Sequence, residues 1–192
     1  MKLSNSLTAK LKISKSINSL FNSVSYRIGS VLVDPGDFWE GLIDVDAVLL
    51  THGHFDHIYG LNQVAELNEG LVVYTNEHGC DMLLDDKKNM SRYHEQPFKF
   101  HYPERIKVVY DGENVAIKNG SVIAKAVFTP GHHPSCITWI IEDNIFSGDA
   151  YIPGVKTVVN LPGGDKERAR ESEMIIKQLI WGNKHIYPGH QI

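Results

Sequence analysis

The stretch LLTHGHFDHIYG gathers three histidines and an aspartate within six residues, directly after an apolar run. Imidazole and carboxylate groups bind zinc, and they also bind iron or manganese. Because residues two apart in an extended segment point the same way, His52 and His54 can bind one ion from one side. Asp56 and His57 lie further round the turn and can face a second ion, and Gly53 keeps the backbone small where the imidazoles converge. The stretch therefore predicts metal binding at the end of a buried strand.

Three later stretches repeat this local design. FTPGHHPS, IFSGDAY and IYPGHQI each place a glycine-containing turn after an apolar run, and these turns present His132, Asp149 and His190. The simplest partition of the seven candidate ligands gives three to each of two ions and shares one between them. The first ion receives His52, His54 and His132, the second receives Asp56, His57 and His190, and Asp149 bridges the two. Each ion then keeps room for a shared water, which is the open position expected of a catalytic centre.

The elements that must position these ligands are short strands and three helices. Strand-like runs occur at Ser25–Asp34, Val45–Thr51, Leu71–Thr75, Ile106–Tyr110, Val115–Lys118, Val122–Thr129, Cys136–Ile141, Asn144–Ser147 and His185–Tyr187. Between two of them, Asn119-Gly120 supplies the positive backbone angles of a tight hairpin turn. Apolar residues at helical spacing predict helices at Ile58–Leu67, Glu77–Leu84 and Lys166–Trp181. This order of elements predicts mixed sheets with helices outside them.

Two segments carry more specific expectations. The last helix is predicted to bury one face, made of Ala169, Met174, Ile175, Leu179 and Ile180. Near the N-terminus, apolar and polar residues alternate at the period of a strand, which predicts a half-buried edge strand. Its apolar positions are Leu7, Ala9, Leu11 and Ile13.

Composition limits the class of protein before any motif is considered. A chain of 192 residues that is 42% hydrophobic indicates one globular domain over residues 1–192. The net charge of −4 and the pI near 6.2 give no basic surface for a long nucleic-acid contact. No apolar run approaches the ~18 residues of a membrane span. Cys80 and Cys136 are too few and too far apart for a disulfide framework, so we expect a cytoplasmic protein.

As a set, the motifs resemble those of the metallo-β-lactamase fold superfamily, and most closely its glyoxalase II-like hydrolases. THGHFDH matches the His-x-His-x-Asp-His signature, TPGH, SGD and PGH match the three later motifs, and LVDPG at Leu32–Gly36 matches the early strand and turn. Their order agrees from Ser25 to His190. The resemblance implies an α/β (α+β) fold, namely a four-layer αβ/βα sandwich of two mixed β-sheets with outer helices and with the metals at one edge. It also implies the ligand partition given above, which is the usual one in the family.

Departures from the family bear on the substrate. Members that hydrolyse β-lactams usually have a cysteine where Asp149 stands, which disfavours antibiotic hydrolysis, and Cys136 is expected to be a buried thiol in the next strand. Glyoxalase II carries a helical domain with basic residues beyond the position of His190, where this chain continues for only two residues. The basic stretch that often follows the GD motif is replaced by AYIPGVK. Glutathione recognition is therefore not expected.

The expected activity is hydrolysis of a thioester or a related small carboxylic ester at two divalent metal ions, most simply zinc. A divalent ion lowers the pKa of bound water from 15.7 to about 7, so a metal-bridging hydroxide can attack the carbonyl. The catalytic candidates are Asp56, which can orient the nucleophile and pass a proton to the leaving group, and the bridging Asp149. Tyr151 is a third candidate, either as a hydrogen-bond donor to the oxyanion or as a core or rim tyrosine without a catalytic role.

Other functions stay open at this point. An iron-dependent persulfide dioxygenase would contain one iron and take up oxygen, and a lactonase or phosphodiesterase would use the same fold. A non-catalytic metal-binding module is the least expected, because the ligand set leaves an open bridging position. The expected partner is a small-molecule substrate, without nucleic acid or membrane, and a homodimer could complete an open cleft.

Several residues outside the ligand set have candidate supporting roles. Asp34 is expected to support the metal ligands from behind or to fix its own turn. His133 should line the cleft or cap a backbone group. Lys88–Phe98 is either a loop that covers substrate or an ordinary exposed connection, and Lys156 and Arg168 could hold an anionic substrate unless they are simply solvated.

Overall fold

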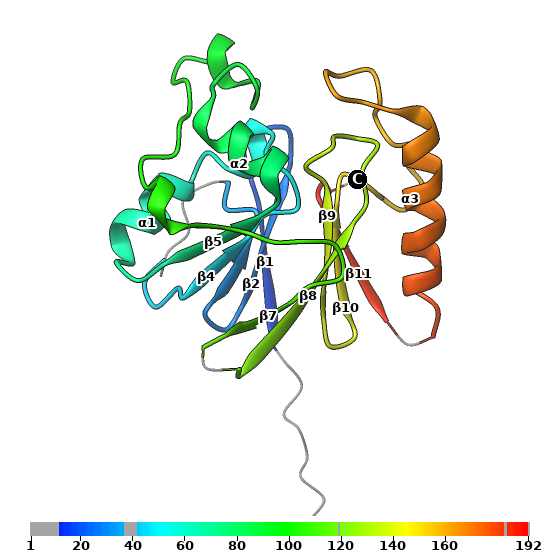
Figure 1. The fold of residues 1–192 in the computed structure, drawn as a ribbon, viewed down its shortest axis with the longest axis horizontal. Helices are drawn as coiled ribbons and strands as arrows, with labels where there is room; N and C mark the ends of the chain where they lie inside the picture. The colour runs from blue at the N-terminus through cyan, green and yellow to red at the C-terminus, as the bar shows by residue number, and fades with distance from the viewer. Residues whose placement is uncertain (1–11, 37–41, 119, 183, 192) are drawn as a thin grey trace, which may run out of the picture.

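Two mixed β-sheets packed face to face form the centre of the computed structural model, which describes residues 12–36, 42–118, 120–182 and 184–191 (Figure 1). Across the first sheet the order is β1 (Ile13–Ile17), β2 (Val24–Ile28), β3 (Val31–Val33), β4 (Ala47–Leu49), β5 (Val72–Thr75) and β6 (Ile106–Val108). This sheet is antiparallel from β1 to β3 and parallel from β3 to β6. The second sheet has the order β11 (His185–Pro188), β10 (Asn144–Gly148), β9 (Ile137–Ile141), β8 (Val122–Phe128) and β7 (Asn114–Ile117). Its β10–β11 pair is parallel and its other pairs are antiparallel.

Helices cover the outer faces of both sheets. α1 (Leu61–Leu67) and α2 (Glu77–Leu84) lie outside the first sheet, and α3 (Lys166–Leu179) lies outside the second (Figure 1). Three short 3-10 helices, η1 (Phe55–His57), η2 (Ser91–Tyr93) and η3 (Pro103–Arg105), lie in the connections. Among the helices of the described residues, none is both long enough and apolar enough to cross a bilayer.

Three clusters of buried apolar side chains fill the three interfaces between these layers. The first lies between the sheets and includes Trp139 and Phe146. The second joins the first sheet to α1 and includes Leu50 and Leu61, and the third lies under α3 around Ile176. The four-layer αβ/βα sandwich that the sequence predicts is thereby confirmed.

The predicted run Ser25–Asp34 is two strands rather than one. Ile28 pairs with Val31 in an antiparallel ladder, so the chain reverses between β2 and β3. Gly29 occupies the turn with φ +58, a conformation that glycine adopts without the steric cost of a side chain. The dipeptide Gly29-Ser30 between two strand-like runs is a hairpin signal that the prediction of a single strand overlooked.

The boundaries of the other elements lie closer to the predicted ones. Helix α1 begins at Leu61 rather than Ile58, because η1 occupies the chain before it. β1 is an edge strand that begins at Ile13, the last of the predicted apolar positions, and the other three, Leu7, Ala9 and Leu11, lie outside the described residues. β7 and β8 pair as the predicted antiparallel hairpin, with residue 119 outside the described part of the chain.

The buried face of α3 differs from the predicted one. Ala169, Ser172 and Ile176 are its buried residues, whereas Met174 and Ile175 are 59% and 39% exposed. Spacings of three and four residues place the buried positions on one side of the helix. Ser172 belongs to this face because its hydroxyl donates to the Pro130 carbonyl at 2.6 Å, so a polar side chain is satisfied inside. Hydrophobicity alone therefore assigned the face incorrectly.

Strands of both sheets end immediately before the candidate site residues. Three of these strands, β8, β10 and β11, belong to the second sheet, and two, β3 and β4, belong to the first. The residues that follow them are Asp34 after β3, Thr51 and His52 after β4, His132 after β8, Asp149 after β10 and His190 after β11. Loops fixed in this way by a rigid sheet can hold side chains at defined separations.

Replacement of Ile176 tests the corrected face of α3. Because Ile176 is fully buried, Ile176→Ala should lower the free energy of unfolding by about 2–5 kcal/mol. Ile175→Ala is the matched control and should cost less than about 1 kcal/mol, since that side chain is partly exposed. Urea denaturation of both variants measures the difference, and equal losses would contradict the assignment.

Candidate metal centre

Three imidazoles form the first of two adjoining groups. His54 Nδ1 and His132 Nε2 lie 2.9 Å apart, and one ligand atom each from His52, His54 and His132 fits within 4.8 Å. The rings of His52 and His132 are perpendicular, with centroids 5.0 Å apart. Three ring nitrogens that converge in this way, without a carboxylate among them, can hold a cation from one side.

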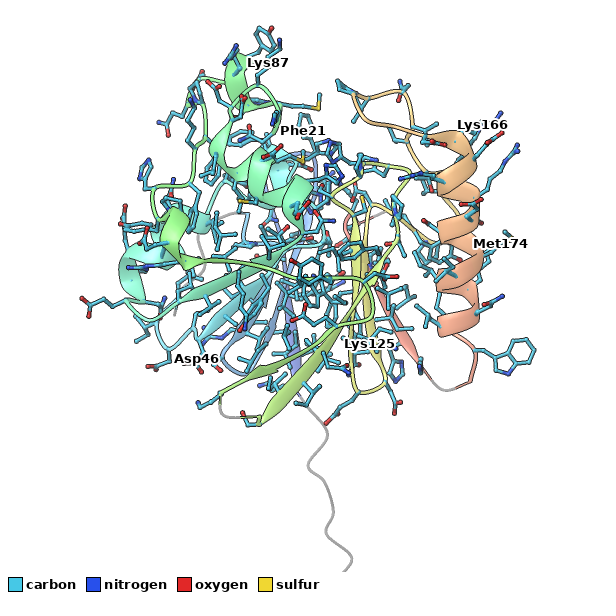
Figure 2. All side chains as sticks on the ribbon, viewed as in Figure 1. Phe21, Asp46, Lys87, Lys125, Lys166 and Met174 are labelled. Atoms are coloured by element: carbon cyan, nitrogen blue, oxygen red, sulfur yellow. The ribbon has the colours of Figure 1, made fainter. Side chains whose placement is uncertain are left out.

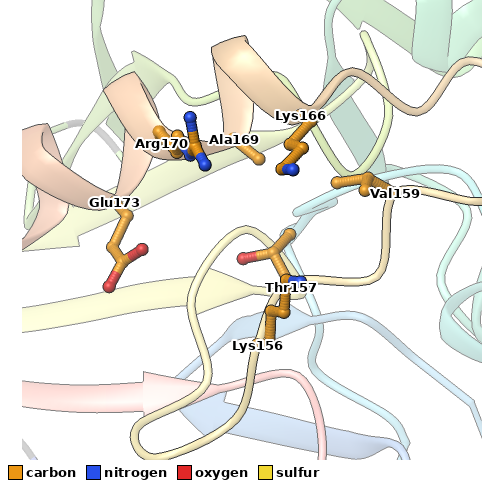
Figure 3. Close-up of a pocket in the computed structure, with 7 residues that line it drawn as sticks. All are labelled: Lys156, Thr157, Val159, Lys166, Ala169, Arg170 and Glu173. Atoms are coloured by element: carbon orange, nitrogen blue, oxygen red, sulfur yellow. The ribbon is translucent and has the colours of Figure 1, made fainter.

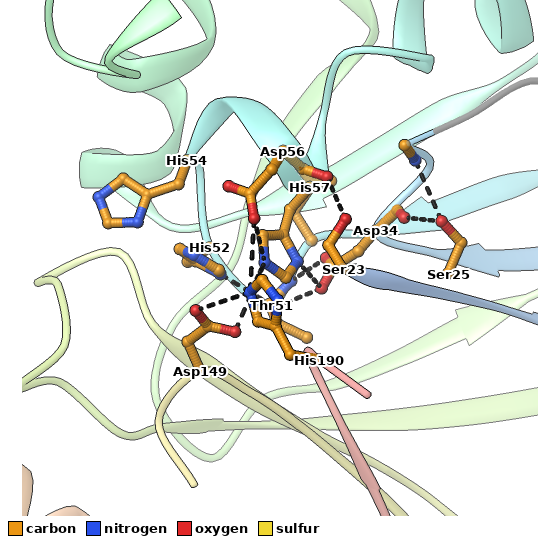
Figure 4. A network of polar contacts seen from close by, with 12 residues as sticks. Ser23, Ser25, Asp34, Thr51, His52, His54, Asp56, His57, Asp149 and His190 are labelled. Atoms are coloured by element: carbon orange, nitrogen blue, oxygen red, sulfur yellow. Dashed lines mark hydrogen bonds and ion pairs between the residues drawn. The ribbon is translucent and has the colours of Figure 1, made fainter. Parts of the chain in front are cut away.

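The second group combines two imidazoles with a carboxylate. His57 Nε2 lies 3.3 Å from His190 Nε2, and Asp56 Oδ2 lies 3.4 Å from each of these nitrogens (Figure 4). Between the groups stands Asp149, whose Oδ1 is 3.4 Å from His57 Nε2. Its Oδ2 is 3.2 Å from His190 Nε2 and 3.6 Å from His132 Nε2. The structure thus brings the seven candidate side chains together. Two of the ligand groups that their atoms can form match the predicted partition, and a third combines His52 and His57, one from each of these groups, with Asp34.

Polar atoms without hydrogen-bond partners lie among the candidate ligands. His52 Nε2 and Asp149 Oδ1 are buried and have no hydrogen-bond partner. A buried polar atom left unsatisfied costs about 1–3 kcal/mol. Bound cations would satisfy both atoms, so the residues present fit a two-ion centre.

The position before His190 has no room for a side chain. A Cβ atom on Gly189 would lie 2.2 Å from Asp149 Oδ1 and 3.0 Å from His57 Cε1. Any larger residue before His190 would therefore push into the second group of ligands. Gly53 has a different role from the predicted one, because its missing Cβ makes room for Met82, at 2.6 Å from the Met82 Cβ, rather than for the imidazoles.

The two groups differ in charge. Burial lowers the pKa of His52 well below its usual value, and burial reinforced by His132 and His133 lowers the pKa of His54 to about 3. These rings are neutral at pH 7 and can offer lone pairs. Neutral imidazole is the form that binds a metal ion.

In the second group, ion pairing shifts the pKa values more than burial does. Burial opposes ionisation of Asp149, but His57 and His190 hold the pKa of its carboxyl well below the usual value. The pKa of Asp56 is lowered in the same way, chiefly by His57. Burial opposes the charged form of His57, yet Asp56 and Asp149 raise its pKa well above normal. Two carboxylates that stay ionised and stabilise the positive charge of a neighbouring imidazole can also stabilise a bound cation.

Backbone carbonyls turn two of the imidazoles toward the centre. His132 Nδ1 donates to the Val158 carbonyl and His190 Nδ1 donates to the Phe21 carbonyl, each at 2.9 Å. Each hydrogen bond fixes the ring and leaves Nε2 as the acceptor that faces the other ligands. No sequence signal marks these partners, because every residue has a carbonyl and only the fold selects one.

Asp34 supports the centre and also fixes its own surroundings, which covers both of the roles expected of it. Its Oδ1 accepts from the Thr51 backbone N–H at 2.7 Å, and its Oδ2 accepts from the Thr51 hydroxyl. His57 Nδ1 also lies 3.1 Å from Oδ2, so His57 Nε2 points at the ligands. Sequence reasoning did not single out Thr51, although its position directly before His52 was an available signal.

Tyr151 is not brought to the ligands by its described contacts. Its ring packs against α3 with Ile180 and the fully buried Ile176, and Lys177 Nζ lies 6.0 Å from the ring centroid. Cys136 belongs to the same cluster and is a buried free thiol, as expected.

Two of the other candidates lie beside the centre. His133 accepts the Ser135 backbone N–H at 3.0 Å, so it caps a backbone group as predicted. The segment Lys88–Phe98 contains η2, and its residue Met90 lines a pocket together with His133. The segment is therefore both an exposed connection and part of a pocket wall.

The two candidate anion-binding cations face different hollows. Lys156 lines a cavity of about 200 Å³ between its own loop and α3, opposite Lys166 and Arg170 (Figure 3). Arg168 lines another cavity, of about 240 Å³, which includes Pro130. The pair does not form one anion site.

These features define a class of protein. A four-layer sandwich that presents two adjoining ligand groups, joined by one carboxylate, at the strand ends of its sheets is the metallo-β-lactamase architecture. The chain belongs to the metallo-beta-lactamase superfamily, whose family model matches residues 20–177.

The sequence identity to individual members of the family is low. The chain is 33% identical over 126 residues to a probable metallo-hydrolase of Bacillus subtilis (YqgX), which covers 63% of this chain and 56% of the relative. It is 28% identical over 131 residues to a hydroxyacylglutathione hydrolase of Hydrogenovibrio crunogenus, covering 64% of this chain and 40% of the relative. The chain therefore spans about half the length of these relatives. Among solved structures, the B3 metallo-beta-lactamase BLEG-1 superposes with a TM-score of 0.82 at 23% identity, covering 94% and 92% of the two chains, which shows the shared fold.

Asp34→Asn tests the supporting role of Asp34. The variant keeps the size of the side chain but replaces one acceptor oxygen with a donor that faces other donors, so it should lose about 1–3 kcal/mol of unfolding free energy. Metal affinity should fall about 10- to 100-fold, because His57 loses the group that orients it. Urea denaturation and titration against a competing chelator measure the two effects. Asp46→Asn, at an exposed ion pair with Lys118, is the control, and equal behaviour of the two variants would refute the role.

Proposed function

We propose that the protein is a metal-dependent hydrolase with a dinuclear centre, most simply of zinc, that cleaves a thioester or a related small carboxylic ester. The position of Asp149 carries the proposal, since its two oxygens reach His57 on one side and His132 on the other at 3.4 and 3.6 Å. A carboxylate shared in this way can bridge two cations. A closed structural zinc site with four ligands would have no shared group and no open position.

The ester class rests on the chemistry of the centre and on its relatives. Two divalent ions held by these residues would lower the pKa of a water between them to about 7 and polarise an ester carbonyl. The relative named as a hydroxyacylglutathione hydrolase supports removal of an acyl group from a carrier that bears a thiol. Nitrogen and oxygen ligands suit zinc, iron and manganese, so the metal has to be identified by measurement.

The side chains around the centre have separate tasks in this reaction. Asp56 contacts both imidazoles of its group through Oδ2, which leaves Oδ1 to accept a proton from the attacking water and pass it to the leaving group. The lowered pKa of Asp56 keeps its carboxylate ionised, which is the form that can accept a proton. Asp34 and the carbonyls of Phe21 and Val158 hold the imidazoles in place, so the ligand geometry does not need to reorganise during the reaction.

Metal analysis combined with Asp149→Ala tests the proposal. Protein purified without added metal should contain close to two zinc ions per chain and should hydrolyse members of a panel of small thioesters. Asp149→Ala should lose metal and reduce turnover at least about 100-fold, because it removes the bridge and a negative charge at the reacting centre. Asp46→Ala, which removes an exposed carboxylate, should retain both the metal and the rate.

Two results would contradict this function. A single iron per chain with oxygen uptake on a persulfide would establish the dioxygenase instead. Two zinc ions without hydrolysis of any thioester or ester would exclude the ester class and direct the assay to lactones and phosphodiesters.

Compartment and assembly complete the proposal. Cys80 and Cys136 are free thiols, which fits a reducing cytoplasm. We expect a homodimer that completes the cleft, and light scattering that finds a strict monomer would reject that expectation.

A further inference from the structure

A pocket of about 740 Å³ opens beside the metal centre. Its walls are the segment from α2 to η2 on one side and the loops that precede β9 and α3 on the other. The apolar part of its lining is Met82, Met90, Tyr93, Pro134 and Pro162. Small-molecule sites commonly have volumes of about 300–1,000 Å³, so the pocket is large enough for most of a substrate.

The pocket adjoins the candidate ligands through two of its lining residues, although none of the seven ligands lines it. His133 lines it, and the His133 ring centroid is 5.3 Å from that of His54. Met82 lines it as well. The Met82 side chain packs against Gly53, which stands between His52 and His54 in the sequence. A group seated in the pocket would therefore leave its attached carbonyl next to the centre.

The charged side chains at the pocket are two carboxylates, Asp81 and Asp85, and two lysines, Lys87 and Lys88. Lys88 Nζ pairs with Asp81 Oδ2 at 2.7 Å, and both side chains are more than half exposed at the rim. Asp85 accepts the backbone N–H groups of Lys87 and Lys88. Between these charged groups the lining consists of the thioethers of Met82 and Met90, two prolines, Gly163 and the imidazoles of His78 and His133, while Tyr93 stands at the rim with 90% of its surface exposed. Such a lining favours a flexible aliphatic chain, because methionine adapts its shape and contributes no charge.

The wall is tied to the metal-binding loop. The Asn89 side chain donates to the carbonyls of Met82 and Phe98 at 2.9 and 3.0 Å, and the Asn89 carbonyl accepts from the Phe55 N–H at 3.0 Å. Met90 follows with φ +69, in a left-handed conformation that Gly or Asn adopts more easily than Met. Asn at position 90 would remove the apolar side chain and would still adopt the left-handed backbone conformation.

We propose that this pocket binds the acyl chain of the substrate, and that this chain is aliphatic and longer than acetyl. The inference rests on the proposed function, since it names the acyl half of the same ester. A short acyl group would leave most of the volume unfilled, and a carrier thiol with charged or amide groups would bury polar atoms against an apolar wall.

Binding of analogues that cannot be hydrolysed tests the pocket without relying on turnover. The probes are the thioethers S-decyl- and S-methyl-N-acetylcysteamine, titrated calorimetrically into metal-loaded and metal-free protein. The decyl compound should bind at least about tenfold more tightly than the methyl compound, with a negative heat-capacity change. Met90→Asn should weaken decyl binding at least about threefold and leave methyl binding unchanged. The matched control, Met174→Asn on the exposed side of α3, should change neither (Figure 2).

Hydrolysis of acetyl and decanoyl thioesters of the same thiol then separates the two proposals. Decanoyl should be preferred in kcat/KM, and the preference should shrink in Met90→Asn. Hydrolysis of both esters at equal kcat/KM, or equal binding of the two thioethers, would overturn the acyl pocket and leave the hydrolase standing. Chain-length-dependent binding that Met90→Asn weakens, without hydrolysis of any thioester, would support the pocket and overturn the proposed function.

Discussion

The carboxylate of Asp34 joins the ends of two neighbouring strands through three hydrogen bonds. It receives the backbone N–H and the hydroxyl of Thr51, which follows β4, and it contacts Nδ1 of His57. Because Thr51 immediately precedes His52, this one group fixes both the start of the metal-binding loop and the orientation of its last histidine. Asp34 itself adopts φ +51 and is 1% exposed, so the strand end, the turn and the buried carboxylate depend on one another. The geometry of the other ligands is defined relative to this fixed point.

The centre also links the two sheets. One sheet supplies the loop with His52 and His57, and the other supplies Asp149 and His190, so the ligand groups contain side chains from both. Direct hydrogen bonds support the same junction, since the Val24 N–H donates to the Gly189 carbonyl and the Tyr26 hydroxyl donates to the Pro188 carbonyl, each at 2.7 Å. Metal binding at such a junction stabilises the packing of the sheets, because the separated sheets would lack a complete ligand set.

The ligand histidines could be predicted because their residue type and their local spacing indicate metal binding. The order of strands and helices likewise predicted mixed sheets with outer helices, whereas the four-layer sandwich was implied by the family resemblance. The carbonyl partners Phe21 and Val158 could not be predicted, since backbone groups carry no residue-specific signal and their choice depends on how distant segments pack. Ser172 shows a second limit, because a polar residue is buried where tertiary structure provides its partner. Gly53 shows a third, as the side chain that it accommodates, Met82, lies on a helix far along the sequence.

The unequal charge of the two ligand groups bears on how such a centre could stabilise a reaction. The three imidazoles of the first group contribute no negative charge, and Asp56 and Asp149 are the carboxylates among the ligands. These two carboxylates offset only half of the charge of two divalent cations. The charge that the ligands leave would attract an anionic nucleophile and polarise a carbonyl, which is the chemistry that such a centre supplies. A third carboxylate, that of Asp34, lies behind His57 at 3.1 Å from its Nδ1, on the side away from the other ligands. The three imidazoles of the first group therefore keep the ligand set itself from neutralising the metals.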